Sequence, residues 1–148
     1  MNIVKSIEQY NEDNVYFLEP IKNNIMNNGN FIRIIYSTPI FVLNGIYIHI
    51  NLNCTTVERY YNKFKCCFDT TLYKEIIEKI QHLEEGLLKK IAINGKTPQH
   101  KIYEQIKNGN IKVFSETPDK ISNSFLLKIA GIWETETDYG LTYKFLIL

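Results

Sequence analysis

Residues 125–148 read FLLKIAGIWETETDYGLTYKFLIL, and this stretch decides the predicted fold. Two apolar runs flank a polar centre, Glu134-Thr-Glu-Thr-Asp138, which is typical of the turn in a long β-hairpin. The two strands carry the only tryptophan of the chain, Trp133, together with Lys128 and Lys144. We therefore expect an antiparallel β domain that ends in a hairpin over 125–148.

The composition is that of one globular domain. The 148 residues are 45% hydrophobic and 22% charged, which gives enough apolar material for a single core. We expect one domain over 1–148, with a polar, Asn-rich N-terminal extension over 1–30. The formal net charge is only +1, so a surface that binds a polyanion has to arise from local clustering of Lys and Arg.

The cysteines indicate the compartment. There are three, two of them adjacent, which argues against a disulfide framework and favours a reducing, intracellular location. Strand alternation places Cys66 in the core. The first residues do not have the pattern of a signal peptide. No stretch approaches the roughly 18 apolar residues of a membrane-spanning helix, so we expect no membrane segment.

Residues 40–52 and 57–68 both alternate with period two, which predicts strands with one buried and one exposed face. Gly45 falls within the first and predicts a bulge or bend. We expect the two strands to pair through residues 53–56. The predicted apolar faces hold Ile40, Val42, Ile46, Ile48, Ile50 and Leu52 on the first strand, and Tyr60, Phe64, Cys66 and Phe68 on the second.

The remaining segments complete the predicted order of elements. Residues 31–36 and 111–114 are expected to be strands, and the three- and four-residue spacing of apolar side chains predicts a helix over 70–91. Thr97-Pro98 is expected to open a short second helix, the alternative being a hairpin that turns at residues 108–110. The order predicts a mainly β fold with one or two helices. It matches an OB-fold-like, five-stranded barrel with a helix between strands three and four, with a generic α+β domain as the alternative.

The chain lacks the sequence signs of an enzyme. There is no phosphate-binding loop, no nucleophile elbow and no metalloprotease motif, and the three histidines are isolated. We therefore expect no catalytic residues, no cofactor and no metal site. The acidic set Glu134, Glu136 and Asp138 would bind a cation if it clustered, but a solvated turn is favoured.

Basic and aromatic side chains on strand faces indicate a nucleic-acid surface, with an ordinary exposed sheet face as the alternative. If the strands 40–52 and 57–68 pair, their polar faces coincide, and one patch holds Tyr47, His49, Arg59, Tyr61, Lys63 and Lys65. Single-stranded nucleic acid requires cations along its backbone and flat rings against which its bases stack. Trp133 is left open between a core position and a stacking position. The predicted binding residues are Tyr47, His49, Arg59, Tyr61, Lys63, Lys65, Lys112, Lys128 and Lys144.

Residues 127–145 and the connector over 104–114 resemble single-stranded-DNA-binding proteins of nucleocytoplasmic large DNA viruses. That group is similar to the replication single-stranded-DNA-binding protein of short-tailed coliphages. The resemblance covers residues 97–148. It implies an OB-fold and binding of single-stranded DNA, without sequence preference, in viral replication, recombination or repair. Its motif positions here are Lys128, Trp133, Tyr139, Tyr143 and Lys144.

The last residues depart from that family. Its phage members end in an acidic tail that recruits partners, whereas this sequence ends in the apolar residues 145–148. An exposed apolar strand end favours pairing with a second copy of the chain, so a homodimer through the C-terminal strand is expected. The departure also leaves an alternative function, a viral structural or protein-interaction module without a DNA role. The resemblance implies a viral replication site in the host cell, or the virion, as the location.

Overall fold

The computed structural model describes residues 5–23, 29–60, 63–114 and 123–148. Within them, the α-helices are α1 (Lys74–Ile91) and α2 (Lys101–Ile106), and a single turn of 3-10 helix is η1 (Glu12–Asn14). The strands are β1 (Lys5–Ser6), β2 (Val15–Phe17), β3 (Ile21–Asn23), β4 (Gly29–Ser37), β5 (Val42–Asn44), β6 (Ile46–Asn51), β7 (Thr56–Tyr60), β8 (Lys63–Cys67), β9 (Thr97–Gln99), β10 (Asn110–Phe114), β11 (Ser124–Glu134) and β12 (Asp138–Ile147).

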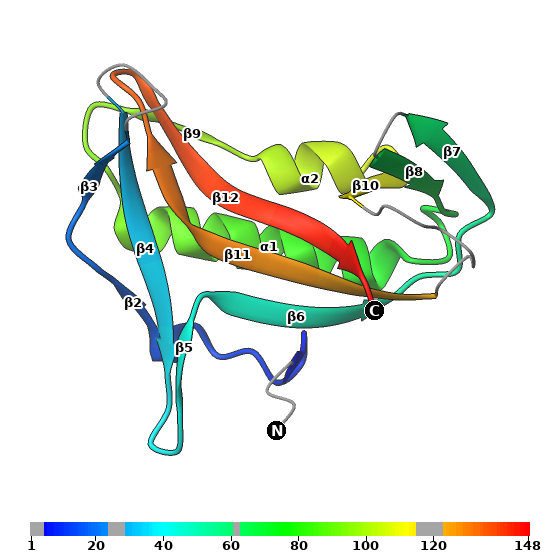
Figure 1. The fold of residues 1–148 in the computed structure, drawn as a ribbon, viewed down its shortest axis with the longest axis horizontal. Coiled ribbons are helices and arrows are strands. Elements are labelled where there is room, and N and C mark those ends of the chain that lie inside the picture. Colours follow the sequence, from blue (N-terminus) through cyan, green and yellow to red (C-terminus); the bar gives the residue numbers. More distant parts are fainter. Residues whose placement is uncertain (1–4, 24–28, 61–62, 115–122) are drawn as a thin grey trace.

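The twelve strands form one sheet whose main path runs β1-β6-β11-β12-β10-β8-β7. β4 pairs with β11 and carries β2, β3 and β5, while β9 pairs with β12. Figure 1 shows α1 behind β11 and β12. The predicted mainly β class with two helices is confirmed. The predicted OB-fold-like, five-stranded barrel is wrong, because the sheet has twelve strands and its main path has separate ends at β1 and β7.

The predicted terminal hairpin is present and forms the centre of the sheet. β11 and β12 pair from Phe125 opposite Ile147 to Glu134 opposite Tyr139. The other edge of β12 is met by β9 at residues 138–140 and by β10 at Phe145. The C-terminal strand is therefore an internal strand. The homodimer through this strand stays an untested prediction. β12 has no free edge for a second copy at the positions where β9 and β10 pair with it.

A bend at Gly45 divides the predicted strand 40–52 into β5 and β6. Gly45 has φ +108°, in the range that favours glycine, so the predicted bend is confirmed. β5 pairs back onto β4, whereas β6 continues along β11. Because the hairpin of β4 and β5 projects from the sheet (Figure 1), Ile40 and Val42 are exposed instead of lying on the core face as predicted.

The predicted strand 57–68 is a hairpin of two strands, β7 and β8. Tyr60 lies opposite Lys63 across its turn. β7 pairs with β8 and not with β6, so the predicted pairing of 40–52 with 57–68 is wrong. Three strands, β11, β12 and β10, separate β6 from β8 along the sheet. When a turn interrupts an alternating segment, the alternation continues, but side chains after the turn point to the other face of the sheet. The sequence pattern alone does not reveal this change.

The two helices pack on one side of the sheet. Ile80, Leu83 and Leu87 of α1 are buried at the predicted spacing, but Leu72 precedes the helix and is exposed. Thr97-Pro98 does not open a helix, because residues 97–99 form β9 beside β12, and α2 begins at Lys101. The buried sheet residues that face the helices come from the central strands and include Ile48, Ile50, Leu127, Ile129, Ile132, Leu141, Phe145, Ile111 and Val113. Cys66 is buried as predicted.

Glu84 of α1 is a fully buried carboxylate that fixes α2. Its two oxygens accept the backbone N–H groups of Ile102 and Tyr103, both at 2.9 Å. These are N–H groups of the first helical turn, which have no partner inside the helix. Burial raises the pKa of Glu84 above its ordinary value of 4.5, and the two backbone donors offset part of this effect.

We expect Gly45→Ala to destabilise the protein by roughly 2–5 kcal/mol, from strained backbone and a new close contact. A Cβ at this position would lie 2.9 Å from the carbonyl oxygen of Ile129. Gly95→Ala is the matched control, because Gly95 also has positive φ but nothing lies within 4 Å of its Cβ position. Urea unfolding of both variants measures the difference. Equal losses would show that the Ile129 contact costs nothing.

We expect Glu84→Gln to destabilise the protein by about 1–3 kcal/mol, because the amide group turns a donor toward a backbone N–H. Because the pKa of Glu84 is higher in the folded than in the unfolded protein, its protonation adds to the free energy of unfolding. This contribution is complete below pH 4.5 and is lost as the pH rises through the pKa of the folded state. The cost of the substitution should therefore be larger at pH 4 than at pH 7, as measured by denaturant unfolding. A cost that grows toward pH 7 would contradict this assignment.

Candidate functional site

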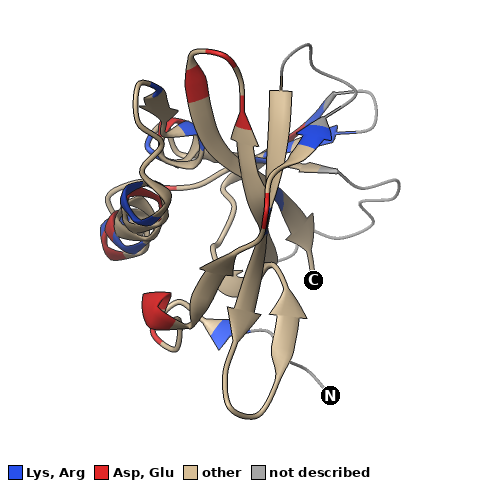
Figure 2. Cartoon of the chain, turned by 90° about the vertical axis from the view of Figure 1, so that its left-hand side faces the viewer, with Lys and Arg blue, Asp and Glu red and all other residues tan. Residues whose placement is uncertain are grey.

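One face of the sheet carries the candidate site. Figures 1 and 2 show α1 and α2 on one side of the sheet, to the rear in Figure 1 and to the left in Figure 2. Within the described residues, neither helix covers the opposite side, which we call the outer face. Figure 2 also shows basic and acidic segments on the helices, whereas the charged segments on the strands at the upper right are mostly basic.

Four lysines and a tyrosine lie in one line across the outer face. Lys65 of β8 is opposite Lys112 of β10, and Lys144 of β12 is opposite Lys128 of β11. Lys112 and Lys144 each precede the bridge between Val113 and Phe145, so they neighbour each other on these parallel strands. Lys128 is opposite Tyr47 of β6. We call Lys65, Lys112, Lys144, Lys128 and Tyr47 the lysine row.

The lysine row concentrates positive charge over a short distance. Five neighbouring strands span about 19 Å at the usual spacing of roughly 4.8 Å. Like charges directly opposite each other on a sheet are destabilising. At one end of the lysine row, Lys65 lies opposite the acidic residue Glu58 of β7. At the other end, the Lys128 ammonium lies 5.6 Å from the centre of the Tyr47 ring, a cation–π contact. The repulsion between neighbouring lysines would be relieved by a bound anion.

The structure brings together most of the predicted site residues and separates one. His49 and Lys63 also lie on the outer face, beside the lysine row, opposite Leu126 and Phe114. Arg59 does not, because it is opposite the buried Phe64, with its guanidinium carbon 6.0 Å from the centre of that ring. Its predicted place with Lys63 and Lys65 is wrong because the β7–β8 turn reverses the face. Tyr61 lies outside the described residues.

A β-bulge turns Trp133 to the outer face. The register of β11 shifts between Ile129 and Gly131. Ile129 and Ile132 are consequently both buried, although residues three apart on a regular strand point to opposite faces. Trp133 therefore lies on the outer face and is half-buried, so the open question between core and surface is resolved in favour of the surface.

Trp133 and Phe31 form a second feature that we call the aromatic ledge. The two residues are directly opposite each other on β11 and β4. A Cβ at Gly140 would lie 2.7 Å from the Trp133 indole, and one at Gly131 would lie 2.7 Å from the Phe31 ring. Each ring therefore covers a glycine of the sheet, an arrangement that the absence of a side chain permits. Both rings remain half-buried.

Sequence reasoning did not select Phe31 and Arg33 as site residues. Arg33 is exposed, lies opposite Gly131, and donates to the Asn44 side chain at 3.4 Å. Both residues alternate with the buried Ile32 and Ile34, a signal that the sequence does contain. What it lacks is a sign that β4 pairs with the end of β11 next to Trp133.

The acidic turn between β11 and β12 is held by contacts within the chain. Glu134 accepts from Asn30 at 2.7 Å and is paired with Lys96 at 3.3 Å. The hydrogen bond from Asn30, with a smaller contribution from Lys96, lowers the pKa of Glu134. Asp138 accepts from Gln99 at 3.1 Å. Among the described residues, no three His, Cys, Asp or Glu side chains gather where they could hold a metal ion.

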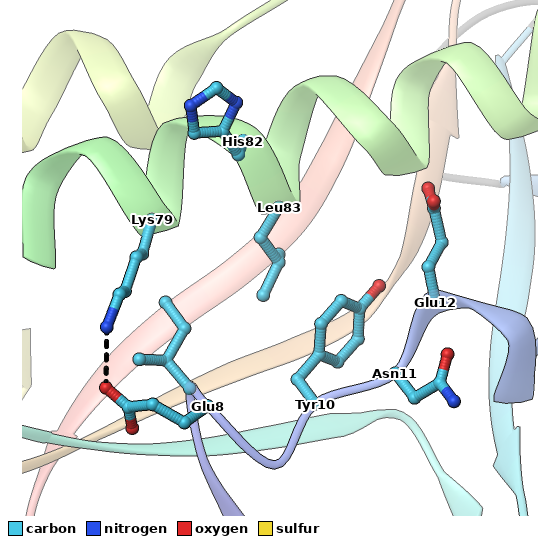
Figure 3. A pocket seen from close by; sticks show the side chains of 8 residues that line it. Glu8, Tyr10, Asn11, Glu12, Lys79, His82 and Leu83 are labelled. Carbon is cyan, nitrogen blue, oxygen red and sulfur yellow. Dashed lines mark hydrogen bonds and ion pairs between the residues drawn. The ribbon is translucent and has the colours of Figure 1, made fainter.

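A hollow of about 390 Å³ lies between residues 7–12 and α1 (Figure 3). Glu8 and Lys79 form an ion pair at 2.9 Å on its rim. Tyr10 has a raised pKa because its hydroxyl is buried, and this hydroxyl has no partner among the described residues. Figure 3 shows His82 directed away from the N-terminal segment. The hollow lies on the helical side, so this part of the N-terminal segment does not cover the lysine row.

Comparisons with protein-family models, with curated proteins and with solved structures found no match for this chain. Within the described residues, neither α-helix has the length and apolar character that crossing a bilayer requires. The candidate site is therefore defined by the structure of this chain alone. It consists of the lysine row, the aromatic ledge and Arg33 between them.

We expect the emission of Trp133 to be quenched by acrylamide in the folded protein, because its ring is partly accessible on the outer face. The single tryptophan makes the signal unambiguous. The native protein should give a quenching constant well above that of a buried indole and below that of the urea-unfolded chain. Blue-shifted emission that acrylamide does not reach would place Trp133 in the core and contradict the bulge.

Proposed function

We propose that this protein binds single-stranded DNA without sequence preference, on the outer face of its sheet. The observation that carries the proposal is the lysine row, in which four cations lie side by side on adjacent strands, in two directly opposite pairs. Such an arrangement costs stability in the free protein and favours a ligand with regularly spaced negative charges. The resemblance to viral single-stranded-DNA-binding proteins supports a role in viral replication, recombination or repair. The proposal assigns no catalytic residue.

The chemistry of the lysine row suits phosphate better than base edges. Ammonium groups bind phosphates as point charges and carry no sequence information. The bound DNA is expected to be single-stranded because Tyr47, at the end of the row, offers a flat ring to an unpaired base. Four phosphate contacts on a single strand predict that log K falls with log salt with a slope of about −3.

We expect oligo-dT to bind with an affinity that falls roughly 50-fold between 50 and 200 mM salt, as that slope requires. The combined variant Lys112→Glu and Lys144→Glu should weaken the binding of oligo-dT, oligo-dC and mixed sequences to a similar extent. The measurement is a fluorescence anisotropy titration of labelled oligonucleotide at the two salt concentrations.

The matched control is Lys89→Glu with Lys90→Glu. It makes the same charge change at the end of α1, away from the outer face, and should leave the affinity nearly unchanged. An equal loss in both variants would show that only net charge matters. Absence of binding to wild-type protein at low salt and sub-millimolar oligonucleotide would exclude the proposed function.

A second candidate function is a protein-interaction or structural module of a virus. The observation that favours it is the tip of the β4–β5 hairpin, where Ile40 and Val42 are 87% and 64% exposed. Exposed apolar side chains at a projecting tip are typical of contacts with another protein. If this reading holds, Ile40→Ser with Val42→Ser should abolish an association of the protein that does not depend on salt. A salt-independent monomer on size exclusion, and absence from virions, would count against it.

A further inference from the structure

We infer that the aromatic ledge is a base-stacking subsite for the strand whose phosphates lie along the lysine row. This inference rests on the proposed function and deepens it. It assigns Trp133 and Phe31 as the residues that hold unpaired bases, and it sets a minimum length for the ligand. The ligand class is an oligonucleotide with exposed bases, as opposed to a mononucleotide or a simple polyanion.

The aromatic ledge presents two neighbouring rings on the outer face. The edges of the Trp133 and Phe31 rings lie so close to Gly140 and Gly131 that no Cβ would fit beneath them. This packing fixes the rings against the backbone of the sheet. Because both side chains are only half-buried, part of each ring stays accessible from the outer face. Rings that are already immobilised lose little conformational entropy when a base stacks on them.

The aromatic ledge suits a base better than a phosphate. Its two side chains, Trp133 and Phe31, are uncharged rings, and the acidic neighbour Glu134 is already paired with Lys96 at 3.3 Å. The rings supply no cation for a phosphate, whereas an unpaired base can stack on them. Arg33 lies opposite Gly131, between the aromatic ledge and the lysine row. Its guanidinium can contact the phosphate backbone of the bound strand there. Phosphate and base contacts are therefore separated along β11.

The spacing of the two features defines the ligand. Lys128 and Trp133 lie opposite Lys144 and Gly140, which are four positions apart on β12, and this corresponds to about 13 Å at the usual rise of roughly 3.3 Å. At a stacked rise of about 3.4 Å per nucleotide, this distance is about four steps and therefore takes about five nucleotides. A mononucleotide cannot reach from the lysine row to the ledge. The affinity for oligo-dT should therefore rise steeply with length up to roughly five nucleotides. Beyond that length, each added nucleotide should raise the affinity only gradually.

The experiment compares two ligands with the same phosphates, dT12 and an abasic 12-mer, on wild-type protein and on Trp133→Leu and Phe31→Leu variants. Isothermal titration calorimetry at 50 mM salt avoids any label that could itself stack. Tyr16→Leu is the matched aromatic control, because Tyr16 is 56% exposed on β2 and is not part of the ledge. Thermal unfolding of each variant confirms that it is folded.

We expect each ledge variant to lose between about 5- and 150-fold in affinity for dT12, the range found for bases stacked on aromatic side chains. Its affinity for the abasic 12-mer should be unchanged, as should the behaviour of the Tyr16 control. If dT12 and the abasic 12-mer bind equally well to every folded variant, the inference is overturned while the proposed function stands. If neither ligand binds to wild type, the proposed function itself fails.

Discussion

The outer face depends on one irregularity, the bulge between Ile129 and Gly131 beside the bend at Gly45. Before the bulge, β11 pairs with β6, and after it β11 pairs with β4. Gly45 makes this exchange of partners possible, because only a residue without a side chain can lie so close to the Ile129 carbonyl at φ +108°. Without the extra residue in β11, Trp133 would face the helices and Arg33 would lose its position beside the lysine row.

The arrangement of the lysine row favours binding of an anion but lowers the stability of the free protein. Phe125, Leu127 and Ile129 of the same strand are completely buried and hold the sheet to the helices. On the other face, Lys128 and its neighbours oppose each other with like charge. The chain tolerates this repulsion because burial of the inner face contributes far more, at about 1.5–3 kcal/mol for each large apolar side chain, than neighbouring surface charges take away.

The sequence predicts those parts of this structure that depend on local periodicity. The terminal hairpin, the long helix, the bend at Gly45 and the burial of Cys66 all follow from alternation, helical spacing or glycine. The errors arise where alternation continues through a change of direction. Alternation predicts Arg59 on the same face as Lys63, because a turn that preserves alternation leaves no mark in the pattern. Trp133 is ambiguous in the sequence because one inserted residue reverses parity.

Strand pairing is the other part that the sequence did not provide. The sequence indicates Lys65, Lys112 and Lys128 individually as basic residues on strand faces, but nothing in it aligns their three strands into one row. That alignment depends on β10 entering between β8 and β12, parallel to β12, through the contact of Val113 with Phe145. Long-range register of this kind is decided by packing in the core, where Val113 and Phe145 are both buried.

The central position of the terminal hairpin has a consequence for how the chain folds. β11 and β12 come last in chain order, yet they join β4, β6, β9 and β10 into one sheet. The pair Arg33 and Gly131 brings together residues 98 positions apart, the difference between their numbers. Closing such long loops is slow, because their entropy is lost before the contacts form. Until the hairpin is in place, β4 and β6 present unpaired edges, so this is the stage at which the chain is most prone to aggregate.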